Sequence, residues 1–252
     1  MSYISATGFL VVPCYNEELR IAPADYWKYL ENQGLFVIFV NDGSADETSQ
    51  RCKSFGLTHA TVLDLPSNQG KANALRQGIL LASANSKDNQ LISIIDADGA
   101  FDKEEVIRII ELAAVKLNNM YDALFTSRVK LAGREISRNP VRHMIGRAIS
   151  ALFATAGLRL PYDTQSGLKV FKMSSGLAEA FQEPFETRWF MEIELIIRMM
   201  NNQHRLCIWE EPLLFWNETK GSKVVSIRSI GIIFQVLKLV RRMKEIKARS
   251  KV

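Results

Sequence analysis

Short apolar segments alternate with segments of helical spacing through the first half of this sequence, and this alternation most limits the folds open to it. The apolar segments are residues 9–13, 37–40, 61–65, 91–95 and 123–126. Helical spacing of apolar residues fills segments 18–32, 46–55, 70–84 and 103–118 between them. Strands that are apolar throughout are typical of a mostly parallel sheet covered by helices on both faces. We therefore predict an α/β, Rossmann-like fold.

The second half has a less regular pattern. Asn139 and Pro140 are typical of a helix start, and we expect that helix to run to about Thr155. We also expect strands at 169–171 and 206–209 and helices at 189–202 and 228–249. No repeat or linker divides the chain. We predict one domain over residues 1–225, followed by a basic amphipathic helix over residues 226–252.

The net charge of +5 is concentrated at the end of the chain. Residues 241–252 contain six basic residues and one acidic residue, which equals the net charge of the whole sequence. A neutral body with a basic tail excludes the broad positive face of a nucleic-acid enzyme. The three cysteines are scattered, without a Cys-x-x-Cys pair, which argues against a zinc site and favours reduced thiols in the cytoplasm.

The last predicted helix has an apolar stripe, formed by Ile233, Val236, Val240 and Met243, opposite a basic side. Such a helix can lie on the cytoplasmic face of an anionic membrane as a peripheral contact. It can equally pack on the body of the protein or form a homodimer. No stretch approaches the roughly 18 apolar residues of a membrane-spanning helix.

Polar residues follow the ends of the first three predicted strands. Pro13, Tyr15 and Glu17 follow the first, Asp42 follows the second, and Lys71 begins the helix after the third. Turn formation and helix capping explain each cluster taken alone. Ligands of open α/β sheets bind at the carboxyl ends of the strands, where these residues meet.

The sequence Asp96-Ala97-Asp98 ends the fourth predicted strand. Two carboxylates this close repel each other unless a cation neutralises them. Oxygen ligands favour Mg²⁺ or Mn²⁺, which commonly complete their shell with phosphate oxygens. An Asp turn before the helix near Asp102 is the alternative. We predict that Asp96 and Asp98 bind a metal ion.

A basic segment follows the fifth predicted strand. Residues 128–147 contain six basic residues, among them Arg128, Arg138 and Arg142, and one acidic residue. Guanidinium groups suit phosphate oxygens, so the segment is a candidate phosphate site, although a solvated basic loop is the alternative.

These segments, in this order, resemble the inverting nucleotide-sugar glycosyltransferases of family 2, which have the GT-A fold. Later segments resemble the dolichyl- or polyprenyl-phosphate sugar transferases of glucosyl or mannosyl type; they are residues 127–128, 163–171, 192–195 and 216–224. The resemblance runs from about Phe9 to Val225. It implies transfer of a sugar, with inversion, from a UDP-glucose-like or GDP-mannose-like donor to a polyprenyl phosphate.

The resemblance also implies roles for individual residues. The residues implied to bind the donor nucleotide sugar are Pro13, Tyr15, Glu17, Asp42, Lys71, Asp96, Ala97 and Asp98, and Asp96 and Asp98 also bind its metal ion. The catalytic candidates are Asp163, Glu192, Glu194, Arg128 and Arg142. The residues implied to bind a phosphate or the acceptor are Arg138, Gln165, Lys169, Ser222 and Lys223.

Three alternatives stay open at this point. A saccharide hydroxyl could replace the lipid phosphate as acceptor, and it would need a carboxylate base. A nucleotidyltransferase would share the sheet but normally has a glycine-rich loop after the first strand, where this chain has Pro-Cys-Tyr-Asn-Glu. A non-catalytic scaffold would have no reason to keep two adjacent carboxylates.

Overall fold

A computed structural model describes residues 8–86, 90–117, 120–158, 160–202, 204, 206–217 and 230–249. Within these residues the main sheet has seven strands in the order β3-β2-β1-β4-β7-β5-β8. All neighbours are parallel except β7, which is antiparallel to both β4 and β5. The strands are β1 (Gly8–Cys14), β2 (Leu35–Asn41), β3 (Ala60–Asp64), β4 (Leu91–Ile94), β5 (Ala123–Ser127), β7 (Lys169–Lys172) and β8 (Ile208–Pro212). A smaller parallel pair joins β6 (Glu135–Ser137) and β9 (Phe215–Asn217).

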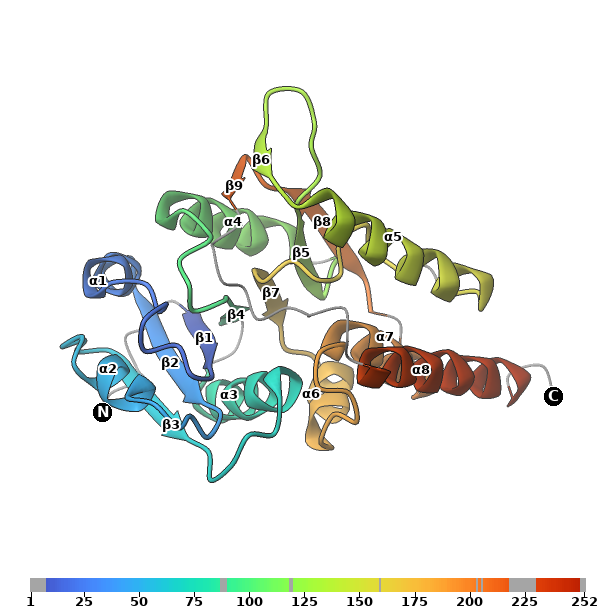
Figure 1. The fold of residues 1–252 in the computed structure, drawn as a ribbon, viewed down its shortest axis with the longest axis horizontal. Coiled ribbons are helices and arrows are strands. Elements are labelled where there is room, and N and C mark those ends of the chain that lie inside the picture. The colour runs from blue at the N-terminus through green and yellow to red at the C-terminus, as the bar shows by residue number, and fades with distance from the viewer. Residues whose placement is uncertain are drawn as a thin grey trace.

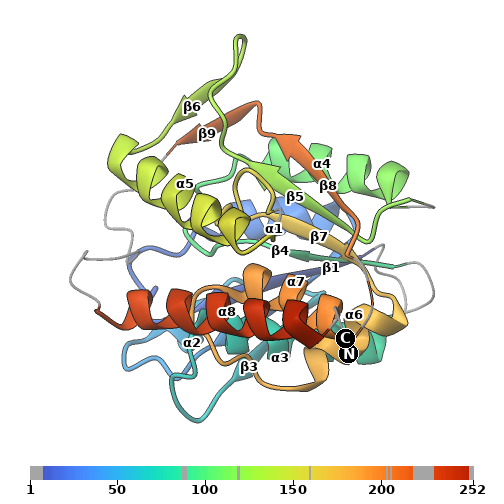
Figure 2. The same cartoon turned by 90° about the vertical axis from the view of Figure 1, so that its right-hand side faces the viewer.

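Helices cover both faces of the main sheet (Figure 1). They are α1 (Ala24–Asn32), α2 (Thr48–Lys53), α3 (Lys71–Asn85), α4 (Lys103–Lys116), α5 (Pro140–Thr155), α6 (Ser175–Gln182), α7 (Met191–Asn201) and α8 (Ile230–Arg249). Residues of α1, α2 and α4 form a core cluster on one face, and residues of α3, α6 and α7 form a second on the other. Helices α5 and α8 both lie on the side that faces the viewer in Figure 2.

The apolar strands are continuous because each one is buried on two sides. In β1, Leu10 and Val12 belong to the first cluster, while Phe9 and Val11 belong to the second. Successive side chains of a strand point to opposite faces, so both sets must be apolar. Burial of each such side chain contributes roughly 1.5–3 kcal/mol.

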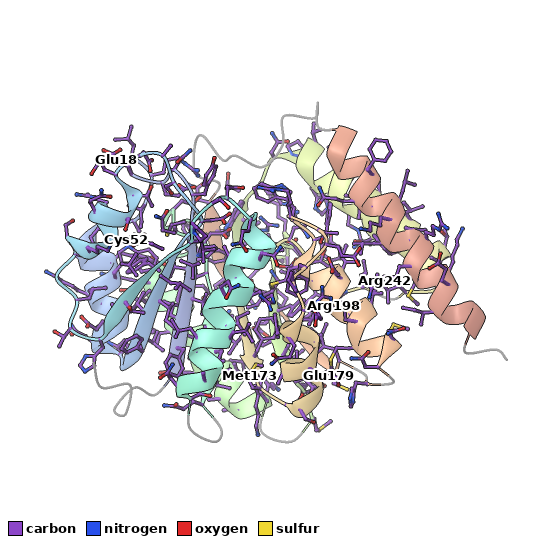
Figure 3. All side chains as sticks on the ribbon, turned by 90° about the horizontal axis from the view of Figure 1, so that it is seen from below. Glu18, Cys52, Met173, Glu179, Arg198 and Arg242 are labelled. Carbon is purple, nitrogen blue, oxygen red and sulfur yellow. The ribbon has the colours of Figure 1, made fainter. Side chains whose placement is uncertain are left out.

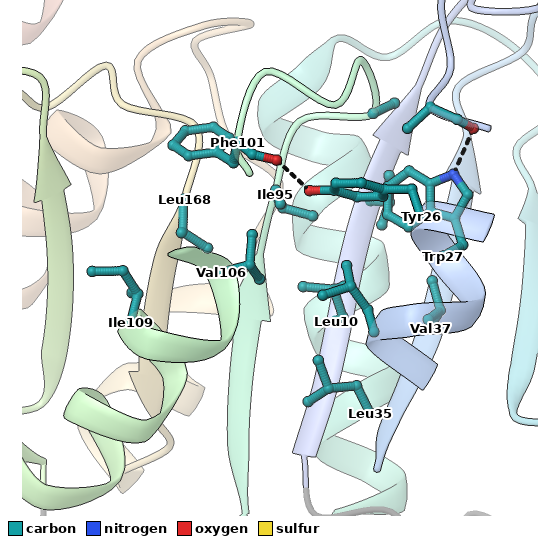
Figure 4. Packing of buried hydrophobic residues seen from close by; sticks show 14 of the residues in the cluster. Leu10, Tyr26, Trp27, Leu35, Val37, Ile95, Phe101, Val106, Ile109 and Leu168 are labelled. Atoms are coloured by element: carbon teal, nitrogen blue, oxygen red, sulfur yellow. Dashed lines mark hydrogen bonds between the residues drawn. The ribbon is translucent and has the colours of Figure 1, made fainter. Parts of the chain in front are cut away.

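Two aromatic residues of α1 anchor the first cluster (Figure 4). The Tyr26 hydroxyl donates to the Phe101 carbonyl at 2.8 Å, and Trp27 Nε1 donates to the Ala22 carbonyl at 2.9 Å. Each buried ring therefore has its polar atom satisfied. The Phe101 bond ties α1 to the loop after Asp96-Ala97-Asp98.

A third apolar cluster joins the two peripheral helices to α7. Phe153 of α5, Ile193 and Ile197 of α7, and Leu239 and Met243 of α8 are all buried in it. Helix α8 therefore packs on the body of the protein over the described residues.

The predicted apolar stripe of this last helix faces the interior. Val236, Val240 and Met243 are buried, while the side chain of Ile233 lies outside the described part of the structure. The sequence left open whether this stripe contacts a membrane, the body of the protein or a second copy of the chain. Its described residues pack on the body. No helix among the described residues is long and apolar enough to cross a membrane.

The predicted fold class is confirmed, with differences at the ends of elements and in the second half. The first helix begins at Ala24, not near residue 18, because the Glu17 carbonyl accepts from the amides of Arg20 and Ile21 in a tight turn. The predicted strand at 206–209 lies at Ile208–Pro212. Helix α6 and strands β6 and β9 were not predicted from the sequence.

Candidate active site

The carboxyl ends of β1, β2 and β4 meet at one edge of the sheet, and two loops there are bound to each other. The Asn16 amide donates to Ser44 Oγ at 2.9 Å, and the Ala45 amide donates to Asn16 Oδ1 at 2.8 Å. Asn16 has a positive φ of 50°, which turns the chain sharply at this point.

The predicted nucleoside residues Pro13, Tyr15 and Glu17 lie along this edge. Pro13 is the one residue of β1 that is not fully buried, and the Tyr15 ring is exposed. The Glu17 amide donates to Thr48 Oγ1 at 2.8 Å, and its carboxylate pairs with Arg20 at 3.2 Å. Tyr15 therefore offers a flat ring to solvent beside a firmly anchored backbone.

Asp42 binds the loop before α3. Its two carboxylate oxygens accept from the amides of Gln69 and Gly70, at 2.7 and 2.8 Å. Burial raises the pKa of this carboxyl, although the two backbone bonds and the charge of Arg188 oppose the rise. Asp42 thus fixes the start of the helix that carries Lys71.

Gly70 has Arg188 packed directly against it. A Cβ built on Gly70 would lie 2.9 Å from Arg188 Cβ, and Gly70 itself has a φ of 91°. The Ala72 amide donates to the Arg188 carbonyl at 3.0 Å, so the segment before α7 covers the start of α3. No sequence signal pointed to Arg188 as a neighbour of this edge.

Asp96 and Asp98 lie at the centre of the edge, and each one is paired with a cation. Lys71 Nζ contacts Asp96 Oδ1, and Arg20 Nη2 donates to Asp98 Oδ2 at 3.2 Å. The Ala97 side chain between them is buried in the first core cluster. Arg20 was not among the predicted site residues, since it is 78 residues away from Asp98 in the chain.

The ionised form of Asp96 is favoured by its surroundings. Desolvation by the surrounding protein alone would raise the pKa of this carboxyl, but Lys71, and then Lys169 and Arg128, outweigh it and lower the pKa. For Lys71 the loss of solvation is likewise outweighed, and its pKa is raised, chiefly by Asp96. Lys71 and Asp96 thus hold each other in their charged forms.

Gly167 leaves room for the Asp96 carboxylate. A Cβ built on Gly167 would lie 2.2 Å from Asp96 Oδ2 and 2.5 Å from its Cγ. A glycine is therefore required here for close approach of the backbone to the carboxylate. Its role was not recognised in the sequence.

The two aspartates fit a divalent metal of the Mg²⁺ or Mn²⁺ type. Both offer hard carboxylate oxygens at a partly exposed edge. Among the described residues, no group of three or more His, Cys, Asp or Glu side chains could hold an ion by itself. Such an ion would accordingly need further oxygens from water or from a phosphate.

A second charged cluster lies beyond β5, centred on the buried Asp163. Arg128 donates to its two carboxylate oxygens from Nε at 2.7 Å and from Nη2 at 2.9 Å, and Arg138 Nη1 donates at 3.2 Å. Burial alone would raise the pKa of Asp163, but the arginines, Arg128 foremost, lower it to about 2. So acidic a group is a poor proton acceptor and instead orients the two guanidinium groups.

Glu210 of β8 positions the loop that carries Asp163. Its carboxylate oxygens accept from the amides of Tyr162 at 2.8 Å and Asp163 at 2.9 Å. Burial raises the pKa of Glu210, although the hydrogen bonds from the amides of Tyr162 and Asp163 oppose the rise. Glu210 was not among the predicted residues.

Lys169 and Glu192 form a buried ion pair near the aspartates. Their Nζ and Oε1 atoms are 2.7 Å apart, and Lys169 Nζ also contacts the Ser166 carbonyl. Both side chains are almost fully buried. Lys169 influences Asp96, and Glu192 influences Lys71, so the pair lies within electrostatic reach of the candidate metal site.

Glu194 has a different environment from Glu192. It is fully buried, and it accepts from the amides of Glu186 and Thr187 and from Arg198 Nη2 at 2.8 Å. Arg198, labelled in Figure 3, also donates to carbonyls of residues 180, 183 and 184. These contacts favour a structural role for Glu194 in the segment before α7, and Glu192 remains the candidate carboxylate of this helix.

The remaining predicted residues divide into those that the structure describes and those that it does not. The Gln165 amide donates to Asp163 Oδ1 at 3.2 Å. The backbone amide of Gln165 therefore helps to hold Asp163 in the arginine cluster. The side-chain Nε2 of Gln165 is buried and has no hydrogen-bond partner among the described residues. The Arg142 side chain, Ser222 and Lys223 lie outside the described part of the structure.

Comparison with known proteins identifies relatives over most of the chain. A family model described as Glycosyl transferase family 2 matches residues 9–170. A dolichyl-phosphate beta-glucosyltransferase of Trichomonas vaginalis is 30% identical over 92% of this chain and 69% of its own length. The dolichyl-phosphate beta-glucosyltransferase of Saccharomyces cerevisiae is 26% identical over 85% of this chain and 68% of its own length.

Solved structures share the fold at lower identity. Glucosyl-3-phosphoglycerate synthase of Mycobacterium tuberculosis is 18% identical, with a TM-score of 0.64 over 97% of this chain and 82% of that chain. A mannosyltransferase of Pyrobaculum calidifontis, solved with GDP-Man and Mn²⁺, is 16% identical, with a TM-score of 0.54 over 88% of this chain and 60% of that chain. The synthase has also been solved with Mn²⁺ and UDP-glucose.

Proposed function

The chain belongs to glycosyl transferase family 2, and on that basis we propose that it transfers a hexose, with inversion, from a nucleotide diphosphate sugar to a polyprenyl phosphate. The dolichyl-phosphate beta-glucosyltransferases that resemble it over most of its length support both the reaction and the lipid phosphate acceptor. The observation that carries the proposal is the pairing of two sites, the aspartates after β4 and the arginine cluster after β5.

The donor side of the proposal rests on the edge formed by β1, β2 and β4. We propose that Tyr15 and the loops after β1 and β2 hold the nucleoside, and that Asp96 and Asp98 hold a Mg²⁺ or Mn²⁺ ion. Bound there, the ion would neutralise the charge of the departing nucleotide diphosphate. Solved neighbours of the same fold contain Mn²⁺ with UDP, UDP-glucose or GDP-Man, which supports a divalent metal.

Lys71 and Arg20 both lie beside the aspartates, with Lys71 paired to Asp96 and Arg20 paired to Asp98. The Lys71 ammonium, at the start of α3, would lie where it can contact a diphosphate oxygen of the donor. The helix N-terminus adds its own positive potential there.

The acceptor side rests on Arg128 and Arg138. Both guanidinium groups are held on Asp163, which is far more acidic than an ordinary aspartate, so the cluster stays charged at neutral pH. Fixed, partly buried guanidinium groups suit phosphate oxygens. The backbone amide of Gln165, which donates to Asp163 Oδ1 at 3.2 Å, helps to hold the cluster in place.

The state of the carboxylates favours a phosphate acceptor over a saccharide hydroxyl. A hydroxyl acceptor needs a base whose pKa lies near the working pH. Asp163 has a pKa of about 2, and Glu192 is paired with Lys169 at 2.7 Å. A phosphate acceptor is already ionised and needs cations for binding, which this site provides. A saccharide acceptor remains the second candidate, and a transfer assay with both acceptors distinguishes the two.

The test is a panel of nucleotide sugars with Mn²⁺, scored for transfer to a short polyprenyl phosphate and to free saccharides. We expect transfer to the phosphate from a UDP-hexose or GDP-mannose, and its loss in Asp98→Ala. Arg138→Gln should raise the KM for the acceptor, whereas the matched surface change Arg51→Gln should have no effect. Transfer to saccharides alone would overturn the acceptor, and full activity of Asp98→Ala would overturn the donor site.

A lipid acceptor also implies a location. We propose that the protein is cytoplasmic and works as a peripheral protein on the cytoplasmic face of a membrane. The alternative to membrane contact is a homodimer formed through α8. It requires a dimer in solution, which sedimentation or light scattering would detect.

A further inference from the structure

Helix α5 has apolar residues on two different sides. Phe153 is buried in the third core cluster with α7 and α8, and Ile149 packs against that cluster. Val141, Met144 and Ile145 are 54%, 67% and 41% exposed. A surface helix that packs by one stripe normally has charged and polar residues elsewhere. The second apolar side of α5 therefore needs an explanation outside the core.

The exposed apolar residues of α5 form one continuous stripe. Val141, Ile145, Ala148 and Leu152 follow one another at intervals of four, three and four residues, and Met144 adjoins them. Residues at these intervals lie on the same side of an α-helix. Leu152 is 39% exposed, so the stripe reaches from the first turn to the last.

Helix α8 adds to the same side of the molecule. Its inner side is buried through Val236, Leu239 and Met243, so its outer side carries Phe234 and Leu237, which are 66% and 53% exposed. Both helices lie on the side that faces the viewer in Figure 2 and at the right in Figure 1. We call the stripe of α5 together with Phe234 and Leu237 the α5–α8 face.

The charges around this face are mostly basic. Arg147 of α5 and Lys238, Arg241 and Lys244 of α8 are exposed. Lys238 and Arg241 keep ion pairs with Glu186 and Glu245, but in both pairs the side chains remain largely open to solvent. An apolar surface with exposed basic residues complements an anionic lipid bilayer, where apolar side chains enter the interface and cations meet phosphate groups.

The stripe begins beside the arginine cluster of the candidate acceptor site. Arg138 lies just before α5, and its Nη1 atom contacts His143 Nδ1 of that helix at 3.2 Å. His143 Nε2 is in turn 3.2 Å from the hydroxyl of Tyr162, the residue before Asp163. A lipid phosphate bound at the cluster would therefore leave its chain next to the exposed stripe.

We propose that the α5–α8 face docks on an anionic bilayer, with the α5 stripe in the apolar part of the interface. The link to the acceptor rests on the proposed function, but docking itself does not require the reaction. The face brings the arginine cluster to the surface from which a polyprenyl phosphate must be taken. The bilayer is favoured over a second copy of the chain because basic residues flank both helices and would face one another in a symmetric dimer.

The test compares the full chain with Met144→Ser/Ile145→Ser and with Phe234→Ser/Leu237→Ser. A matched control is Val115→Ser/Met120→Ser, which removes two exposed apolar residues elsewhere. Binding is measured by flotation with vesicles of phosphatidylcholine alone and with added phosphatidylglycerol. Transfer is measured with long-chain polyprenyl phosphate in vesicles and with a short, water-soluble prenyl phosphate. Circular dichroism and urea unfolding confirm that each variant is folded.

We expect the wild type and the control to bind anionic vesicles and each face variant to bind about tenfold less tightly, since each loses two interfacial apolar side chains. Face variants should lose transfer to the vesicle-borne acceptor and keep transfer to the soluble one. Vesicle binding unchanged in the face variants, or no binding by the wild type, would overturn the proposal. So would a wild-type dimer that the face variants dissociate without any change in vesicle binding. Absence of transfer to either acceptor by the wild type would instead refute the proposed function, while vesicle binding still decides the docking.

Discussion

Substitution of Gly167 by alanine gives the sharpest test of the candidate donor site. A Cβ at this position would lie 2.2 Å from Asp96 Oδ2 and 2.5 Å from Asp96 Cγ. Comfortable contacts between such atoms are about 3.5 Å, so the carboxylate or the Gly167 backbone must shift by about 1 Å. The Asp96 side chain can shift more easily than the Gly167 backbone, because it lies at the partly exposed edge of the sheet.

A shift of this size should affect activity more than stability. Misplacement of a group by about 1 Å at a reacting site costs roughly 100-fold in rate, which is about 2.7 kcal/mol. Crowding in the protein itself should cost about 1–2 kcal/mol of unfolding free energy, because a partly exposed side chain can relieve it. Gly167→Ala should therefore fold while its kcat/KM for the donor falls by about two orders of magnitude.

The assay is transfer of labelled sugar at varied donor and Mn²⁺ concentrations, together with urea unfolding. Gly231→Ala is the matched control, because nothing lies within 4 Å of a Cβ built there. The control should keep full activity. A folded Gly167→Ala protein with kcat/KM within threefold of wild type would refute the inference that the position of Asp96 governs donor use.

Four further predictions concern buried charges and the metal ion. Asp163→Asn should lower the free energy of unfolding by about 3 kcal/mol at pH 7, since it leaves two guanidinium groups without their anion. In the wild type the pKa of Asp163 is about 2 in the folded protein and 3.8 in the unfolded chain. Ionised Asp163 therefore contributes about 2 kcal/mol to the free energy of unfolding above pH 4, and this contribution is lost as the pH falls toward 2. If the free energies of unfolding of the two proteins change in parallel with pH across this range, the prediction is wrong. Glu194→Gln should reduce the free energy of unfolding by about 2–3 kcal/mol, because it weakens the buried pair with Arg198. The kcat of the folded protein should stay near the wild-type value. A loss of kcat without loss of stability would indicate that Glu194 takes part in the reaction. Removal of metal with EDTA should abolish transfer. Lys71→Gln should tighten Mn²⁺ binding about tenfold in the absence of nucleotide, because it removes the cation that competes with the ion for Asp96. An unchanged Mn²⁺ affinity in calorimetry would rule out this competition.

The sequence was sufficient to predict the sheet and its ligand-binding edge. Strand β1 is apolar at every position that two layers of helices bury, and that pattern is local and readable. The carboxyl ends of parallel strands meet at one edge by geometry alone, so the strand pattern by itself predicts that Asp42 and Asp96 lie near each other. Asp96 and Asp98 are two residues apart in the chain, and a pair of this kind is visible without tertiary information.

The same local reasoning failed where the partner is distant or where a glycine gives no chemical signal. Arg20 meets Asp98 across 78 residues, and Glu210 holds the amide of Asp163 across 47. Gly167 looks like any glycine until the Asp96 carboxylate is found against it. These contacts depend on how loops pack over the sheet edge, which sequence spacing does not determine.

Residue type alone also could not separate carboxylates with different tasks. Glu192 and Glu194 are two residues apart on α7, yet one pairs with Lys169 near the aspartates and the other holds the backbone before the helix. Their side chains project about 200° apart around a helix, so the packing of α7 decides which one faces the site.

What the sequence by itself determined is therefore the family of the fold, the edge at which ligands bind and the aspartate pair, because each follows from periodicity or from close spacing. Only the tertiary structure decided which arginines gather on Asp163 and which side of each peripheral helix is buried. The sequence made membrane contact one alternative for the apolar stripe of α8, but this stripe packs on α7. Helix α5 instead carries an apolar stripe that is exposed to solvent. Amphipathicity reveals that a helix has an apolar side, but the surface that covers this side is set by neighbours distant in the chain.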